Sequence, residues 1–148
     1  CLGYRKQTER WRSAIRQGWF QSGDLFTVDE DGYYWFAGRS DDVFKSRGYQ
    51  ISPVEIEAVL NEHAAVAESL VVGDPEPAIG HQIRAVVVLR PGHQPSAALA
   101  DEIKAAIRSQ VAPYKVPKMI ECADQLPKNP VGKVVRQRVR NAPVPSSP

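Results

Sequence analysis

One segment in the middle of the sequence constrains the fold more firmly than any other. Ser52, Pro53 and Glu55 combine an N-cap residue, a proline at the first helical position and a glutamate three residues after the cap. This pattern predicts a helix over residues 53–62. The apolar residues that follow recur at i, i+3 and i+4, so they form one buried stripe: Ile56, Val59 and Leu60.

The segments around this helix predict a small α+β domain over residues 42–140, with a short β-sheet flanked by helices. Strands are expected over 66–72 and 83–89, with a loop over 73–80 that contains two prolines between them. A helix should begin near Ser96 and be stopped by Pro113. A strand over 118–123 and a helix over 134–141, with basic residues on its exposed side, should follow. Before this domain, residues 19–37 predict a β-hairpin turning at Asp31-Gly32. We assign that hairpin to a different structural unit.

Composition excludes several classes of protein. A formal charge of +2 is too small to indicate nucleic acid or an anionic membrane as a partner, and no apolar run is long enough to span a membrane. Two cysteines, Cys1 and Cys122, fit a reducing compartment, and the three histidines lack metal-ligand spacing. We therefore expect a cytoplasmic chain without a bound metal of its own. It begins on Cys1 without a methionine, so we expect a piece of a longer protein, and we expect the tail over residues 141–148 to be disordered.

Four short segments carry residues suited to chemistry, and each also has a plainer interpretation. Asp24 could bind two ribose hydroxyls or belong to an ordinary turn. Residues 38–48 could approach a ligand closely or form a self-neutralising surface loop. Lys133 ends a proline-bounded loop and could bind a phosphate or simply be exposed, but Val134 follows it, so this is not a Walker A loop. The basic run Arg136, Arg138 and Arg140 indicates a solvated helix face.

Taken together, the order and content of these segments resemble the closing third of the adenylate-forming (AMP-binding) superfamily, and in particular acyl- and aryl-CoA synthetases. The matching motifs are Gly18-Trp19-Phe20-Gln21-Ser22-Gly23-Asp24, Asp31-Gly32-Tyr33, Gly38-Arg39-Ser40-Asp41-Asp42, Gly48-Tyr49-Gln50-Ile51-Ser52-Pro53, Glu55-Ile56-Glu57, and Leu126-Pro127-Lys128 with Gly132-Lys133. The resemblance covers residues 1 to about 140. It implies that residues 1–40 end a large N-terminal domain, residue 41 is a hinge, and residues 42–140 form a mobile C-terminal lid domain.

The resemblance also implies a role for seven residues. Lys133 matches the catalytic lysine that bridges the substrate carboxylate and the α-phosphate. Asp24 and Arg39 would hold the ribose, Lys45 and Gln50 would lie near the adenylate, Gly48 would line the tunnel for the pantetheine arm of coenzyme A, and Asp41 would be the hinge.

The implied enzyme is an acid–thiol ligase related to fatty acid metabolism. It would activate a small carboxylic acid with ATP and Mg²⁺, both bound mainly by the N-terminal domain, and then transfer the acyl group to coenzyme A by domain rotation. The fragment alone should be inactive. Two alternatives stay open: an adenylation domain that loads a carrier protein's phosphopantetheine thiol, and a small basic module that binds RNA or an acidic partner.

Overall fold

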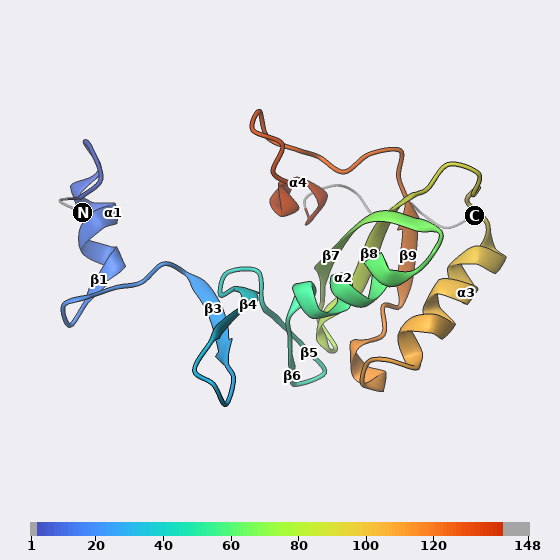
Figure 1. The fold of residues 1–148 in the computed structure, drawn as a ribbon, viewed down its shortest axis with the longest axis horizontal. Helices are drawn as coiled ribbons and strands as arrows, with labels where there is room; N and C mark the ends of the chain where they lie inside the picture. Colours follow the sequence, from blue (N-terminus) through green and yellow to red (C-terminus); the bar gives the residue numbers. More distant parts are fainter. Residues whose placement is uncertain (1–2, 141–148) are drawn as a thin grey trace. The chain divides into compact units, whose positions relative to one another are not determined.

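The computed structural model describes residues 3–140, and the chain divides into two compact units, one up to Asp41 and one from Asp42 onward (Figure 1). The predicted tail over 141–148 lies outside the described residues. No helix among residues 3–140 has the length and apolar character needed to cross a membrane.

The first unit consists of a short helix and two small antiparallel strand pairs. Its elements are α1 (Thr8–Ala14), β1 (Ile15–Arg16), β2 (Trp19–Phe20), β3 (Asp24–Val28) and β4 (Tyr34–Arg39). The β3–β4 hairpin confirms the predicted one. Its turn is fixed by Asp29, whose carboxylate accepts hydrogen bonds from the backbone of Asp31 and Tyr33 and from the indole of Trp35. The sequence motifs did not predict α1 or the β1–β2 pair.

The second unit is the expected α+β domain. Its elements are β5 (Phe44–Ser46), β6 (Tyr49–Ile51), α2 (Pro53–Glu62), β7 (Val66–Glu76), β8 (Gly80–Leu89), α3 (Ala97–Arg108), the 3-10 turn η1 (Pro113–Lys115), β9 (Met119–Cys122) and α4 (Arg136–Arg140). The main sheet has the order β7-β8-β9, with β7 antiparallel and β9 parallel to β8. The predicted helix over 53–62 is confirmed at both ends, and Ser96 caps α3 by accepting a hydrogen bond from the Leu99 amide.

Alternate residues of the sheet pack into two apolar clusters, one on each face. The larger cluster joins Val71, Ala85 and Val87 to residues of α2 and α3, including Ile56, Leu60, Ile103 and Ile107. The smaller cluster joins Leu70, Val72 and Val86 to Leu126 and Val139. The segment after β9 is therefore fastened to the sheet face opposite α2 and α3.

One charged side chain is buried within this sheet. Arg84 of β8 is only 1% exposed. It donates hydrogen bonds to Asp74 at 2.7 and 2.9 Å, to Glu121 at 2.9 Å and to the Val139 carbonyl at 3.1 Å. The bonds to Asp74 raise the pKa of Arg84 against the opposing effect of burial. Arg84 thus joins all three strands to α4, and its own buried charge is paired with two carboxylates.

Three predicted elements differ from the structure. The helix expected from Ser96 until Pro113 ends earlier, at Arg108. The loop expected over 73–80 is mostly strand, because β7 continues to Glu76 and Pro75 pairs with His81. Proline is tolerated there since β7 is an edge strand. The last helix has only the five residues of α4, and its basic residues do not all face solvent: Arg136 points inward and is 14% exposed.

Candidate active site

In the first unit, the β3–β4 register brings together two predicted ribose ligands. Asp24 pairs with Arg39 across the hairpin, and the Arg39 Nη1 donates to Asp24 Oδ1 at 3.0 Å. The Arg39 Nε donates to Asp41 Oδ1, also at 3.0 Å. A Cβ on Gly23, where φ is +79°, would lie 3.1 Å from Arg39 Nη2, so glycine leaves room for the guanidinium. The side chains of Asp24 and Arg39 are 31% and 39% exposed and so stay accessible to a ligand.

In the second unit, the β5–β6 hairpin carries three more of the predicted residues. Lys45 pairs with Gln50, and Arg47 and Gly48 form a two-residue turn with φ of +52° and +83°. Positive φ at both positions is typical of a type I′ hairpin turn, which favours glycine. A Cβ at Gly48 would meet no atom within 4 Å in the part of the chain that the structure describes, so this glycine faces open space there.

The hairpin is fixed to the rest of its unit by a backbone hydrogen bond and a ring contact. The Arg47 amide donates to the Ile79 carbonyl at 2.8 Å, and Tyr49 stacks on Tyr114 with ring centroids 4.1 Å apart. A cavity of about 380 Å³ lies beside the turn, lined among others by Arg47, Tyr114 and Lys118. The cavity has cationic and aromatic lining next to the glycine turn.

The predicted lysine lies on a loop that one asparagine organises. The Asn129 Oδ1 accepts hydrogen bonds from the amides of Val131 at 3.1 Å and Lys133 at 2.8 Å. The backbone N–H of Asn129 donates to the Lys133 carbonyl at 2.8 Å. The backbone of Lys133 is thereby fixed while its side chain is exposed. Sequence reasoning did not assign Asn129 a role, although asparagine before a Pro-x-Gly segment is a known turn signal.

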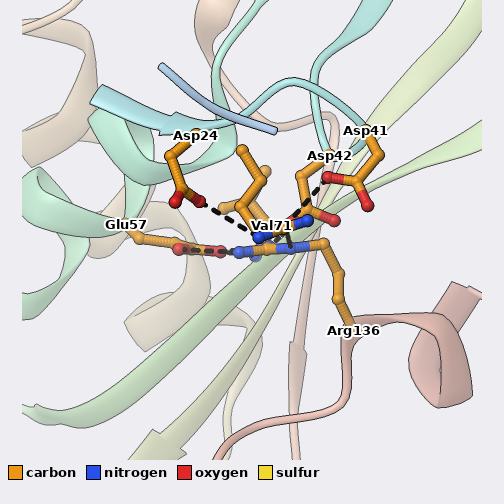
Figure 2. A network of polar contacts seen from close by, with 7 residues as sticks. Asp24, Asp41, Asp42, Glu57, Val71 and Arg136 are labelled. Carbon is orange, nitrogen blue, oxygen red and sulfur yellow. Dashed lines mark hydrogen bonds and ion pairs between the residues drawn. The ribbon is translucent and has the colours of Figure 1, made fainter. Parts of the chain in front are cut away.

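The segment after this loop is held by the inward-facing Arg136 (Figure 2). Its guanidinium donates to both carboxylate oxygens of Glu57 and to the Val71 carbonyl, and its Nε lies 3.2 Å from Asp42 Oδ2. Burial opposes the charge, but the Glu57 and Asp42 carboxylates outweigh it and raise the pKa of Arg136. The sequence-based interpretation of Arg136 as part of a solvated basic face is therefore wrong. The alternative of an RNA-binding module depended on three exposed arginines, and Arg136 is not exposed.

The predicted site residues thus form three groups. Asp24, Arg39 and Asp41 are joined by ion pairs in the first unit. Lys45, Gly48 and Gln50 share the β5–β6 hairpin. Lys133 stands apart from that hairpin: the loop between β9 and α4 and the β5–β6 hairpin lie at opposite ends of the second unit (Figure 1).

Comparison with known proteins decides the family. The profile described as AMP-binding enzyme C-terminal domain matches residues 55–133. The chain belongs to this family. Among curated relatives, the 4-hydroxybutyrate–CoA ligase 1 of Metallosphaera sedula is 42% identical over 139 residues, and the acetyl-coenzyme A synthetase of Bacillus subtilis is 43% identical over 120. These alignments cover 94% and 81% of the chain but only 24% and 21% of the relatives. The chain therefore spans about a quarter of their length.

Solved structures confirm the fold of this AMP-binding enzyme C-terminal domain. The anthranilate CoA ligase AuaEII, in complex with anthranoyl-AMP, is 40% identical with a TM-score of 0.86 over 94% of the chain and 27% of that structure. The amide bond synthetase McbA from Marinactinospora thermotolerans is 32% identical with a TM-score of 0.84, over 94% of the chain and 28% of that structure. Similar structures therefore include both a CoA ligase and an amide bond synthetase.

Proposed function

We propose that this chain is the C-terminal part of an AMP-forming acid–thiol ligase. In this proposal the whole enzyme activates a small carboxylic acid with ATP to an acyl-adenylate and then transfers the acyl group to the thiol of coenzyme A. The family assignment and the CoA ligases among the relatives support the reaction class. Because the chain spans about a quarter of those relatives, it should not catalyse adenylation by itself.

The observation that carries the proposal is the placement of two loops in one domain. The loop with Lys133 and the turn with Gly48 lie at opposite ends of the second unit (Figure 1). They cannot both face one acyl-adenylate at the same time. Rotation of the domain would present them in turn, Lys133 for adenylation and the smooth Gly48 turn for thiol attack. Asp41, the last residue of the first unit, is the proposed hinge.

Each proposed role fits the chemistry of the side chain. Lys133 would neutralise the substrate carboxylate and the α-phosphate while pyrophosphate leaves. Asp24 Oδ1 is bound to Arg39, so a ribose hydroxyl would donate to Oδ2 while the guanidinium holds the carboxylate in place. Lys45 and Gln50 would lie near the adenylate, and the cavity beside Gly48 would admit part of the thiol substrate. In this proposal Mg²⁺ would be held with ATP mainly by the N-terminal part of the enzyme. Residues 3–140 hold no cluster of three or more His, Cys, Asp or Glu suited to a metal ion.

That preceding part is also the proposed partner of the β3–β4 hairpin. The hairpin exposes several large apolar side chains: Phe26, Val28, Tyr33, Tyr34, Trp35 and Phe36. An apolar surface of this kind usually marks an interface. A role in fatty acid metabolism and a cytoplasmic location remain predictions.

The test is pyrophosphate exchange by the full-length enzyme with a panel of short, medium-chain and aromatic acids. The proposal predicts exchange that depends on one class of acid, followed by thioester formation with coenzyme A. Thioester formation only on a phosphopantetheinyl carrier protein would favour an adenylation domain instead. No acid-dependent exchange would refute the ligase function.

A further inference from the structure

Arg136 joins three parts of the second unit that lie far apart in the sequence. Through Asp42 it reaches the first residue of the unit, through Glu57 it reaches α2, and through the Val71 carbonyl it reaches β7 (Figure 2). The side chains of Arg136 and Glu57 are both 14% exposed. A bidentate arginine–carboxylate pair with so little solvent is rigid in both distance and orientation.

The same pair closes the outer edge of the sheet. Val71 belongs to β7, an edge strand. Its amide donates to Glu57 Oε1 at 2.6 Å and its carbonyl accepts from Arg136. Glu57, Val71 and Arg136 therefore form a closed set of hydrogen bonds. Protection of the sheet edge is by itself a sufficient structural reason for these hydrogen bonds. A role for Arg136 in the reaction therefore requires a separate connection between Arg136 and Lys133.

The backbone supplies that connection. Arg136 begins α4 three residues after Lys133, and the intervening residues pair with the chain before the loop. The Val135 amide donates to the Pro127 carbonyl at 2.7 Å, and Val134 bridges to Lys128. One end of this paired segment is held by the buried Leu126, which is 3% exposed, and the other end by Arg136. Removing Arg136 would loosen the paired segment at the end nearer Lys133, while Val139 would still hold the far end of α4 to the sheet.

We propose that Arg136 is a positioning residue for Lys133, and that its pair with Glu57 sets where the lysine lies relative to Asp42 at the start of the domain. This inference rests on the proposed function, in which Lys133 acts in adenylation only. Arg136 itself touches no substrate. Its effect would appear in the half-reaction that uses Lys133 and not in the other.

The experiment compares Arg136→Gln with two matched variants of the full-length enzyme. Arg138→Gln makes the same change at an exposed position of α4, and Ile103→Val lowers stability from within the core, where the side chain is 1% exposed. For Arg136→Gln, kcat of pyrophosphate exchange should fall by about 10- to 100-fold, the effect of a small displacement of a reacting group. KM for ATP and thioester formation from supplied acyl-adenylate should stay unchanged. Arg136→Lys should restore part of the loss.

A second measurement does not depend on activity. Amide hydrogen exchange of Lys133 and Val135, whose amides donate to Asn129 and Pro127, should speed up in Arg136→Gln and not in the two matched variants. If Arg136→Gln does not fold, Glu57→Gln removes the carboxylate partner and should give a smaller loss in the same direction.

Two results would overturn the inference. One is equal loss in both half-reactions, matching the loss in Ile103→Val, which would show a purely structural role. The other is unchanged hydrogen exchange at Lys133 and Val135. Absence of exchange between ATP and pyrophosphate in the unaltered enzyme would instead refute the proposed function, while the amide measurement would still decide whether Arg136 fixes the loop.

Discussion

Lys133 differs from the other lysine of its loop in its partners. Lys128 is paired with Glu68 at 2.7 Å, whereas Lys133 has no ion pair among residues 3–140. A substrate anion would therefore not have to displace a carboxylate from Lys133. Lys133→Ala should slow pyrophosphate exchange by about two to three decades, the usual effect of removing one electrostatic stabiliser. Thioester formation from supplied acyl-adenylate, measured in single turnover, should be nearly intact.

The control for this prediction is Arg138→Ala, an exposed cation on α4 that should leave exchange within the range of ordinary surface substitutions. Acetylation of Lys133 should reproduce the alanine variant because it removes the charge. Equal loss in both half-reactions would contradict a role confined to adenylation.

Substitutions at Gly48 can distinguish the effect of backbone strain from that of steric obstruction. The φ of +83° at Gly48 disfavours any residue with a Cβ, yet a Cβ there would contact nothing among residues 3–140. Gly48→Ala and Gly48→Leu should therefore destabilise the fold to a similar extent, by about 1–2 kcal/mol. Only the leucine should obstruct the thiol step, and pyrophosphate exchange should survive in both. Melting temperatures and single-turnover thioesterification test this, and two variants slowed equally in the thiol step would exclude obstruction by side-chain size.

At the scale of elements, Asp29 makes the β3–β4 turn sensitive to acid. The hydrogen bond from Trp35 is the largest cause that lowers the pKa of Asp29 below its ordinary value of 3.8. The ionised Asp29 carboxylate therefore stabilises the fold fully above pH 3.8. This stabilisation is lost as the pH falls through the lower pKa that Asp29 has in the folded state. The NMR signal of the Trp35 indole N–H should stay constant from neutral pH down to about 4 and move below that.

Asp29→Asn should remove this acid transition, while Glu30→Gln on the same turn should leave it. A transition centred above pH 4 would show that the hydrogen bond from Trp35 does not stabilise the carboxylate in solution.

Sequence patterns predicted elements where a local signal and the tertiary packing agree. Helix α2 matches at both ends because its N-cap residue type, its proline and its apolar stripe all indicate the same span, although the Ser52 side chain makes no capping hydrogen bond. The extent of β7 could not be predicted, since Pro75 is acceptable only in an edge strand and strand order is a property of the folded sheet. The five residues of α4 are too few to show a helical period, so nothing in the sequence indicates that Arg136 faces inward.

The residues of the candidate site divide in the same way, into those that a local pattern predicts and those that only the whole fold brings together. The Asp31-Gly32 turn signal predicts that the strands carrying Asp24 and Arg39 pair, although these two residues face each other only because a β-bulge between Leu25 and Phe26 shifts the register. By contrast, the contacts of Arg136 with Glu57 and Asp42 join residues 79 and 94 positions apart, and the pairing of such residues depends on the whole fold.

At the scale of the whole molecule, the division at Asp41 and Asp42 predicts that the second unit folds by itself. Both apolar clusters, and the networks of Arg84 and Arg136, lie entirely within it. A chain of residues 42–140 should therefore melt cooperatively. Limited proteolysis of residues 1–148 should cut first near Ser40, and early cuts scattered between Pro53 and Val111 would contradict this boundary.

The hinge assignment predicts an unequal effect on the two half-reactions. Asp41→Pro fixes φ at the last residue of the first unit, so one of two domain orientations should be favoured over the other. A difference of about 1.4 kcal/mol between two conformations changes their populations tenfold. The ratio of adenylation rate to thioesterification rate in the full-length enzyme should therefore shift by about tenfold or more. Because Asp41 also binds Arg39 at 3.0 Å, Asp41→Ala is the control that removes this ion pair without fixing φ. An equal shift in the alanine variant would assign the effect to the ion pair and not to rotation about residue 41.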